Sequence, residues 1–452
     1  MTREQRLVLV VSILASFVAL LDGFAVNVAL PAIVRDLGGG LQIQQWVVDG
    51  YLLTLGSLIL VAGSFSDLFG RRRILKIGLI WFLATSLLCA VAPNGPFLVV
   101  ARLLQGAGGA LLVPSSLALI MSTFSGKGEG KAIGTWTAWI SIAALIGPLV
   151  GGVLVDAASW RWIFAINVLP VTVTLALITR LHSTEHRAKD VRVDGLGVIL
   201  CVLGLGGVVY GFIEQATYGW SAPRVFIPLA LGVLAFVWFV RNEQRVPNPM
   251  LPLSLFASRN FAVGNIATFV VYGGLSLSSF LISVFVQQVA GYSALQAGLT
   301  TLPVTVMMFF LSSRVGALGT KYGPRAFMAV GPIVAGLGGL WFLTVDNRAV
   351  YVTQLLPGIL LFGIGLATTV TPLTTAILGA IDPARAGIAS AVNNAVARIA
   401  GLVAVAVLGL VVGDHLNVSG FHKGAIFMAS LLIVGGLISA VGIQNHVAKS
   451  EH

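Results

Sequence analysis

The feature that most limits what this chain can fold into is a series of long, nearly uninterrupted apolar runs. Fourteen such runs lie near residues 7–33, 44–66, 74–92, 97–122, 132–155, 162–180, 194–214, 224–240, 261–290, 296–318, 326–344, 350–378, 387–412 and 423–444. They are about 20 residues long or longer, which is the length of helix that crosses the hydrocarbon core of a bilayer. Only helices and closed barrels satisfy every backbone amide in lipid, and barrel strands are much shorter than these runs. The sequence therefore predicts an all-α polytopic membrane protein with fourteen transmembrane helices.

The composition excludes most soluble alternatives. Hydrophobic residues make up 57% of the 452 residues and charged residues only 10%, whereas a soluble domain carries about 25% charged residues. The formal net charge of +11 is compatible with nucleic-acid binding, but the Lys and Arg residues stand in short loops between apolar runs and do not alternate with aromatic residues. We therefore expect no nucleic-acid partner.

The loop charges predict how the chain is oriented. With the amino terminus in the cytoplasm, about 20 Lys and Arg residues fall in inside loops and about 5 in outside loops, as the positive-inside rule requires. The first apolar run is too long for a signal peptide and no A-x-A site follows it, so we expect a retained helix. An even number of helices places both termini in the cytoplasm of a bacterial cell, in its cytoplasmic membrane.

No enzyme motif is found in the sequence. It contains no Walker sequence, H-E-x-x-H, nucleophile elbow or cluster of metal ligands, and its six His residues are scattered. Cys89 and Cys201 stand inside apolar runs and are expected to be packing residues. We therefore expect no enzymatic activity, no metal and no cofactor.

An internal repeat divides the chain. The segment GSFSDLFGRRR at Gly63–Arg73 has a degraded copy in GALGTKYGPRA at Gly316–Ala326, and QGAGGALLVP has a similar counterpart in FGIGLATTVTP. The separation exceeds a six-helix unit by two helices. We predict a six-helix bundle at 1–181, two inserted helices with cytoplasmic connectors at 182–260, and a second six-helix bundle at 261–452.

The loop after the second run has a specific pattern of small and charged residues. Gly63 allows close backbone approach, Asp67 is suited to cap a helix or pair with a cation, and Gly70 precedes an arginine cluster that begins at Arg71. An ordinary positive-inside loop explains the arginines, but it does not explain the spacing of the glycines and the aspartate.

The fifth run ends in Gly147, Pro148, Gly151 and Gly152. Proline kinks a helix, and small residues three or four apart let another helix pack closely. From composition alone, a general packing face is the favoured interpretation.

These segments together resemble the major facilitator superfamily. The loop resembles its G-x-L-x-D-x-x-G-R-K/R signature, with Phe65 in place of Leu, and RLLQGAGG in the fourth run resembles its R-x-x-Q-G motif. The run SIAALIGPLVGG resembles the G-P-x-x-G-G motif of its antiporters. LDGFAVNVALP at Leu21–Pro31 and WRWIFAINVLP at Trp160–Pro170 resemble motifs of the fourteen-helix drug:proton antiporter group, although Phe24 and Ala25 depart from it.

The resemblance covers nearly the whole chain. It implies the major facilitator fold, in which two six-helix bundles form a pseudo-twofold repeat, here with two inserted helices. It also implies a gating role for Asp67 and Arg71, and a hinge or seal role for the Gly147–Gly152 motif in an exchange cycle.

Three charged residues stand within apolar runs of the first half. Asp22, Asp49 and Arg102 each carry an insertion penalty of at least about 2.5 kcal/mol if charged, so each is a functional candidate. We predict that the two aspartates carry protons and that Arg102 modulates them. Two alternatives stay open: a fixed ion pair that only locks helices together, and an electrostatic site on Asp22 for the cationic part of a drug.

Other residues near these charges are candidates for the substrate cavity. Phe24, Asn27 and Tyr51 neighbour the aspartates, although most aromatic residues in such a chain are packing residues or interface anchors. Arg398 and Asn394 lie among polar residues in the run 387–412 and are further candidates for the substrate cavity. The alternative for Arg398 is that it pairs with helix carbonyls. Glu214 ends an inserted helix near the outer surface, where we expect it to be solvated.

The sequence predicts a proton-coupled efflux antiporter that exports lipophilic or cationic drugs by alternating access, with protons as the coupling ion. Its expected partners are a small-molecule substrate and membrane lipid, and a monomer is expected. A proton-coupled uptake symporter and a lipid or lysolipid translocase on the same fold are the alternatives.

Overall fold

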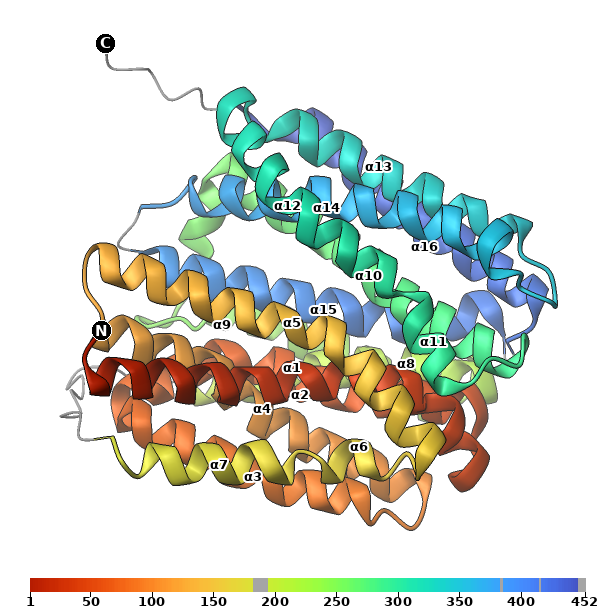
Figure 1. Cartoon of the computed structure of the whole chain (residues 1–452), viewed down its shortest axis with the longest axis horizontal. Helices are drawn as coiled ribbons and strands as arrows, with labels where there is room; N and C mark the ends of the chain where they lie inside the picture. Colours follow the sequence, from red (N-terminus) through yellow and green to blue (C-terminus); the bar gives the residue numbers. More distant parts are fainter. Residues whose placement is uncertain (182–193, 383–384, 414–415, 446–452) are drawn as a thin grey trace. The chain divides into compact units, whose positions relative to one another are not determined.

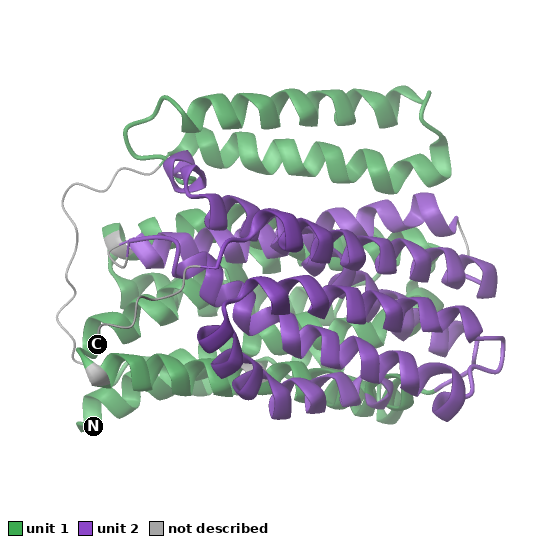
Figure 2. Ribbon diagram, turned by 90° about the horizontal axis from the view of Figure 1, so that it is seen from above, with its two compact units in different colours: residues 1–251, 293–298 green, residues 252–292, 299–452 purple. Residues whose placement is uncertain are grey.

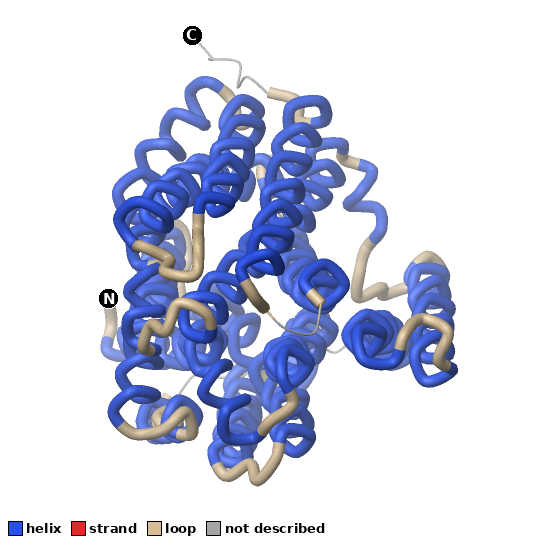
Figure 3. The backbone as a smooth tube through the Cα atoms, turned by 90° about the vertical axis from the view of Figure 1, so that its right-hand side faces the viewer, coloured by secondary structure: helices blue, strands red, loops and turns tan. Residues whose placement is uncertain are grey.

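The protein is all-helical in a computed structural model that describes residues 1–181, 194–382, 385–413 and 416–445. Within these ranges Figure 3 shows helices joined by loops and no strand. Thirteen of the described helices are long and apolar enough to cross a membrane, and the segment Trp162–Ile178 is a shorter apolar helical stretch. The predicted all-α polytopic fold is confirmed, with a number of crossings near the fourteen expected.

Two compact units make up the chain (Figure 2). Unit 1 comprises Met1–Leu251 and Ser293–Gly298, and unit 2 comprises Pro252–Tyr292 and Leu299–His452. In unit 1 the helices are α1 (Arg3–Leu37), α2 (Gly40–Phe69), α3 (Arg71–Ala90), α4 (Gly95–Thr123), α5 (Lys127–Ala157), α6 (Trp162–Ala165), α7 (Val168–Ile178), α8 (Gly195–Tyr218) and α9 (Pro223–Glu243). Most of the short helix α11 (Ala294–Thr300) also belongs to it.

Most helices of unit 2 are likewise long (Figure 1). They are α10 (Arg259–Gln288), α12 (Leu302–Tyr322), α13 (Arg325–Trp341), α14 (Leu356–Leu378), α15 (Ala386–Val412) and α16 (Val418–Gly442), with short helical turns at Leu253–Ala257, Phe342–Thr344 and Tyr351–Leu355.

Helix ends are set by polar caps and by glycine. The Asn94 side chain accepts a hydrogen bond from the Phe97 amide at the start of α4, and Asp194 caps α8 in the same way. Gly70, with φ of 96°, is the single residue between α2 and α3. Because this positive φ is strained for residues with a side chain, glycine at this position allows the chain to turn directly from one helix into the next.

Close packing in unit 1 depends on glycine at helix crossings. A Cβ atom added at Gly106 of α4 would lie 2.2 Å from the carbonyl oxygen of Tyr51 in α2. In the inserted hairpin of α8 and α9, which Figure 2 shows running side by side, a Cβ at Gly207 would lie 2.4 Å from the Pro228 carbonyl oxygen. Small residues bring the backbones into contact, as in other membrane helix pairs.

Three of the predicted helices are interrupted. The run 162–180 is split into α6 and α7 around Ile166 and Asn167, the run 296–318 is split at Thr301, and the run 350–378 begins with a π turn at Tyr351–Leu355. The first interruption matters most, because it places the side chain of Asn167 at the centre of unit 1.

Candidate functional site

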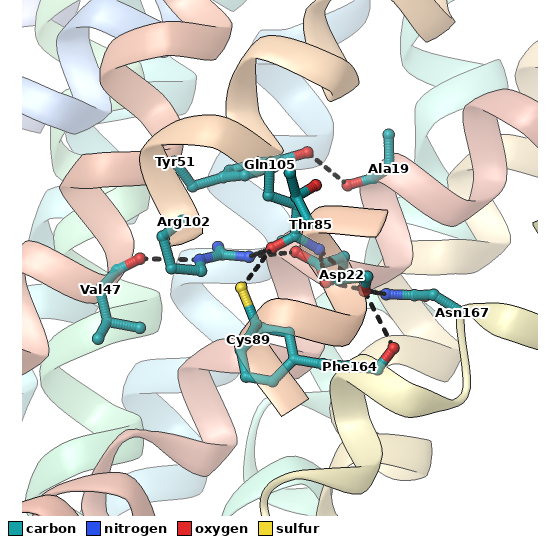
Figure 4. A network of polar contacts seen from close by, with 12 residues as sticks. Ala19, Asp22, Val47, Tyr51, Thr85, Cys89, Arg102, Gln105, Phe164 and Asn167 are labelled. Atoms are coloured by element: carbon teal, nitrogen blue, oxygen red, sulfur yellow. Dashed lines mark hydrogen bonds and ion pairs between the residues drawn. The ribbon is translucent and has the colours of Figure 1, made fainter. Parts of the chain in front are cut away.

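A buried ion pair joins α1 to α4 in the middle of unit 1 (Figure 4). The Nη1 atom of Arg102 lies 2.5 Å from Oδ2 of Asp22, and each residue is only 1% exposed. Both side chains point into the helix bundle. Of the two predicted aspartates, Asp22 is therefore the one that the structure brings to Arg102.

Two amide side chains complete the surroundings of Asp22. Its Oδ1 atom accepts hydrogen bonds from Gln105 Nε2 at 2.9 Å and from Asn167 Nδ2 at 3.1 Å. Both amides also donate to Ser86 Oγ, whose hydroxyl donates to the Phe164 carbonyl at 3.0 Å. Asp22 thus accepts hydrogen bonds from three side chains, an arrangement that stabilises a buried carboxylate.

Arg102 makes further contacts through its Nε atom and through the flat face of its guanidinium. Its Nε donates to the Val47 carbonyl of α2 at 3.0 Å, and its guanidinium lies 4.3 Å from the centre of the Tyr51 ring. The Tyr51 hydroxyl donates to the Ala19 carbonyl at 3.0 Å. Tyr51 therefore packs against the arginine and ties α2 to α1 (Figure 4).

Asp49 has very different surroundings from Asp22. It is 0% exposed, and among the described residues neither carboxyl oxygen has a hydrogen-bond partner. It is two residues from Val47, the residue that binds Arg102, yet it makes no ion pair in the described ranges. A buried carboxyl group without partners is energetically costly when ionised.

The face of α2 that includes Asp49 is turned towards the inserted helix α8. Trp46, one turn before Asp49, donates a hydrogen bond from Nε1 to Oε1 of Glu214 at 2.9 Å. One turn after Asp49, Leu53 packs against the glycine face of α8 at Gly206. The inserted hairpin is thus packed beside the segment of α2 that carries Asp49.

The expected solvated position of Glu214 is wrong. The residue is only 8% exposed and accepts the Trp46 hydrogen bond described above. Its position near a helix end suggested that it reaches water, but an indole donor on a neighbouring helix compensates its burial instead.

The glycine motif of α5 packs against α1 next to Asp22. A Cβ atom at Gly147 would lie 2.8 Å from the Cβ of Phe24, and one at Gly151 would lie 3.0 Å from the Ala25 carbonyl oxygen. The Cβ of Phe24 therefore packs on Gly147 of α5, while Asn27 donates to the Gly23 carbonyl of its own helix at 3.2 Å.

The other side of the same motif contacts the segment 293–298. A Cβ atom at Gly152 would lie 2.6 Å from the Cα of Leu295, and Gly298 packs on the carbonyl of Pro148. Asp156, one turn further along α5, accepts the backbone amides of Ala294 at 3.0 Å and Leu295 at 2.9 Å. The motif thus has two packed faces and no ligand-binding side chain.

The predicted gating loop ties α2 and α3 to neighbouring helices. Arg71 donates to the Ala118 carbonyl of α4 at 3.0 Å, and Arg72 donates to the Thr179 carbonyl at the end of α7 at 3.2 Å. Gly70 forms the turn. The expected close backbone approach at Gly63 is wrong in this arrangement, since an added Cβ there would meet no atom within 4 Å. The side chain of Asp67 lies outside the described part of the structure.

Arg398 and Asn394 lie on α15, which belongs to unit 2, whereas the other predicted site residues belong to unit 1. Asn394 is exposed and donates to the Ser390 carbonyl at 3.0 Å, and Arg398 is half-buried. Over the described ranges, no group of three His, Cys, Asp or Glu residues is suited to hold a metal ion.

Some residues of the site were not predicted from the sequence. Gln105 and Asn167 bind Asp22, and Arg161 forms an ion pair with Asp36 near the end of α1. The motif RLLQGAGG contains Gln105, and WRWIFAINVLP contains both Arg161 and Asn167. These motifs identified the segments, but the contacts are seen only in the structure. Asn167 binds Asp22 and Arg161 binds Asp36, so the segment WRWIFAINVLP contacts α1 at two positions.

Comparisons with known proteins agree with this architecture. The sequence profile of the Major Facilitator Superfamily matches residues 12–405. Multidrug resistance protein Stp of Mycobacterium tuberculosis is 36% identical over 92% of this chain and 78% of its own length. The methylenomycin A resistance protein of Bacillus subtilis is 32% identical over 98% and 94%, and the puromycin resistance protein pur8 of Streptomyces alboniger is 37% identical over 89% and 81%.

Solved structures show the same fold at low sequence identity. The crystal structure of peptide transporter POT in complex with sulfate has a TM-score of 0.70 and 15% identity, over 96% of this chain and 93% of that one. A partially occluded inward-open structure of the xylose transporter XylE from E. coli has a TM-score of 0.67 and 15% identity, over 99% and 100%.

Proposed function

Because this chain belongs to the Major Facilitator Superfamily, we propose that it is a proton-coupled antiporter that exports lipophilic or cationic small molecules by alternating access. Relatives at 32–37% identity are named for resistance to methylenomycin A, to puromycin and to multiple drugs. These names support export of small organic compounds.

The observation that carries the coupling is the contrast between the two buried aspartates. Asp49 has no partner for either oxygen among the described residues, so the neutral acid is the form that this arrangement favours. Asp22 faces Arg102 and accepts two amide hydrogen bonds, so this arrangement supplies it with the counter-charge and donors that Asp49 lacks. Asp49 is therefore suited to take up and release the coupled proton, and Asp22 is suited to stay paired with Arg102 until a substrate or a proton replaces the arginine.

This contrast supplies a way to link proton movement to conformation. When Asp49 loses its proton, its carboxylate needs a cation, and Arg102 is already bound to Val47, two residues away on the same helix. If Arg102 turns to Asp49, Asp22 in turn requires a proton or the cationic part of a substrate. Each proton that moves inward releases about 2.3 kcal/mol per 100 mV of membrane potential.

The glycine motif of α5 supports exchange without a leak. Gly147 and Gly151 pack on α1, and Gly152 packs on the segment 293–298. Packing of backbone on backbone leaves no space for water, so this region is suited to seal the pathway during the cycle.

The test is the direction of flux in proteoliposomes. The protein is reconstituted with an imposed pH gradient, and movement of the cationic dye rhodamine 6G is followed together with internal pH. The antiporter moves dye against the direction of proton flow. Dye moving with the protons would show a symporter, and movement of labelled lysolipid without a gradient would show a lipid translocase; either result would contradict the proposal.

We place the protein in the bacterial cytoplasmic membrane with both termini in the cytoplasm, on the basis of the loop charges. Fusion of a fluorescent protein after His452 is expected to give fluorescent cells, and fusion of alkaline phosphatase at the same point is expected to be inactive. An active phosphatase fusion would contradict this orientation.

A further inference from the structure

The helices of unit 2 contain a cation at membrane depth that has no acidic partner in the described part of the structure. Arg398 is the thirteenth residue of the 27-residue helix α15, and within the described ranges it makes no hydrogen bond or ion pair. Not one of the helical segments of unit 2 contains an Asp or Glu residue. The described acidic residues of the unit, Asp346 and Asp382, stand in loops.

An arginine in this position differs from an arginine near a helix end. Arg314 of the same unit is eight residues from the end of α12 and is exposed, so its long side chain can extend towards the interface. Arg398 is about 18 Å from the first residue of its helix and about 21 Å from the last at the usual rise per residue. A charge at this depth is expensive unless it faces water or an opposite charge.

The neighbours of Arg398 are polar and their arrangement is ordered. Asn393 donates to Thr268 Oγ1 of α10 at 2.8 Å, which fixes the rotation of α15 against α10. Asn394 and Arg398, one turn apart, consequently share the adjacent face of α15. Tyr272, one turn beyond Thr268 on α10, lies close enough to Arg398 for an electrostatic interaction.

The two units thus differ in their intramembrane charges. In unit 1 the buried arginine has a carboxylate partner, Asp22, within hydrogen-bond distance. In unit 2 the arginine is accompanied by a tyrosine and an exposed asparagine, all of which donate hydrogen bonds and none of which carries a negative charge at neutral pH. Among the described residues of unit 2, the group that this face lacks is an anion.

We propose that Arg398, with Tyr272 and Asn394, binds an acidic group of the exported molecule, a carboxylate or a phenolate. The proposal rests on the export function described above and extends its substrate class from lipophilic and cationic compounds to anionic and zwitterionic ones. A guanidinium binds a carboxylate through two parallel hydrogen bonds, which an ammonium group cannot do. The phosphate of an anionic lipid has the same chemistry, and the experiment separates it from a soluble substrate.

The test uses two xanthene dyes that share a ring system but differ in charge, the anion fluorescein and the cation rhodamine 6G. Export from proteoliposomes is measured for the wild type, Arg398→Gln and Arg398→Lys, and Arg314→Gln is the matched control. The ratio of fluorescein to rhodamine 6G export is expected to fall about tenfold or more in Arg398→Gln, to fall less in Arg398→Lys, and to stay at the wild-type value in Arg314→Gln. Because the readout is a ratio, partial misfolding of a variant affects both dyes alike.

A direct binding measurement tests the subsite at Arg398 without relying on proton-coupled export. Fluorescence anisotropy of fluorescein is measured with purified wild type and Arg398→Gln, with and without phosphatidylglycerol. Binding that depends on Arg398, without any gradient-driven export, would support this subsite and contradict the proposed antiport. An unchanged ratio, equal loss of both dyes, or Arg398-dependent binding of phosphatidylglycerol but not of fluorescein would overturn the subsite.

Discussion

Asp22 and Asp49 lie on neighbouring helices and are both fully buried, yet of the two only Asp22 has hydrogen-bond donors around it among the described residues. The sequence placed both at membrane depth. A pattern of apolar residues predicts depth, but it does not predict which side chains meet. Whether a buried acid is paired depends on residues more than 50 positions away, such as Arg102 and Asn167. The structure therefore separates two residues that the sequence treated alike.

The paired aspartate is expected to matter for stability. Asp22→Asn leaves Arg102 as an uncompensated buried cation, so it should lower the free energy of unfolding by about 3–5 kcal/mol. The double variant Asp22→Asn with Arg102→Gln removes both charges and should recover a large part of that loss. Thermal unfolding of the purified variants checks this, and a double variant less stable than Asp22→Asn alone would show that the pair is not the cause.

At the scale of single helices, the two-sided packing of α5 leads to a prediction about Gly152. In Gly152→Ala the new methyl group would lie 2.6 Å from the Cα of Leu295 and must push the segment 293–298 away. A cysteine introduced by Ala297→Cys, at a site only 2% exposed, should then react at least about threefold faster with a maleimide, since local opening governs access.

The matched control for this experiment is Gly134→Ala in the same helix, where an added Cβ meets no atom within 4 Å. It should leave the labelling rate of Ala297→Cys unchanged. Equal rates in the two glycine variants would mean that Gly152 does not hold the segment in place.

The inserted hairpin has a prediction of its own. Ser57 of α2 lies against Cys201 of α8, so Ser57→Cys should form a disulfide with Cys201 under a mild oxidant. Adding Glu214→Ala removes the acceptor of the Trp46 hydrogen bond and should slow cross-linking several-fold, because the hairpin is held less firmly. The disulfide is measured by gel shift after alkylation of free thiols. A rate that does not respond to Glu214→Ala would show that this hydrogen bond does not dock the hairpin.

Across the whole molecule, the sequence predicts elements better than their connections. The apolar runs correspond to described helices because backbone amides in lipid are satisfied within the helix itself, a constraint that acts on each segment separately. The break at Asn167 was not predicted, because it lies inside a continuous apolar run and its reason, the hydrogen bond to Asp22, is a tertiary contact. The burial of Glu214 was missed for the same reason, since its partner Trp46 is 168 residues away.

The candidate site was predicted in part. The motifs pointed to Asp22, Arg102 and the Gly147–Gly152 segment, whose spacing follows from local chemistry. The roles assigned to them as proton carriers, cavity residues and gate remain predictions, because they concern changes between conformations. Proton coupling is a property of the whole cycle, and it is here that Asp49 is the decisive residue.

Drug-induced proton release, compared between the wild type and Asp49→Asn, tests whether Asp49 carries the coupled proton. The variant replaces a carboxyl group that has no partner among the described residues by an amide of nearly equal size. Its free energy of unfolding should therefore stay within about 1 kcal/mol of the wild-type value. With rhodamine 6G added to purified protein in weakly buffered detergent solution, the wild type should release protons and Asp49→Asn should release almost none. Proton release from folded Asp49→Asn at the wild-type level would contradict the account.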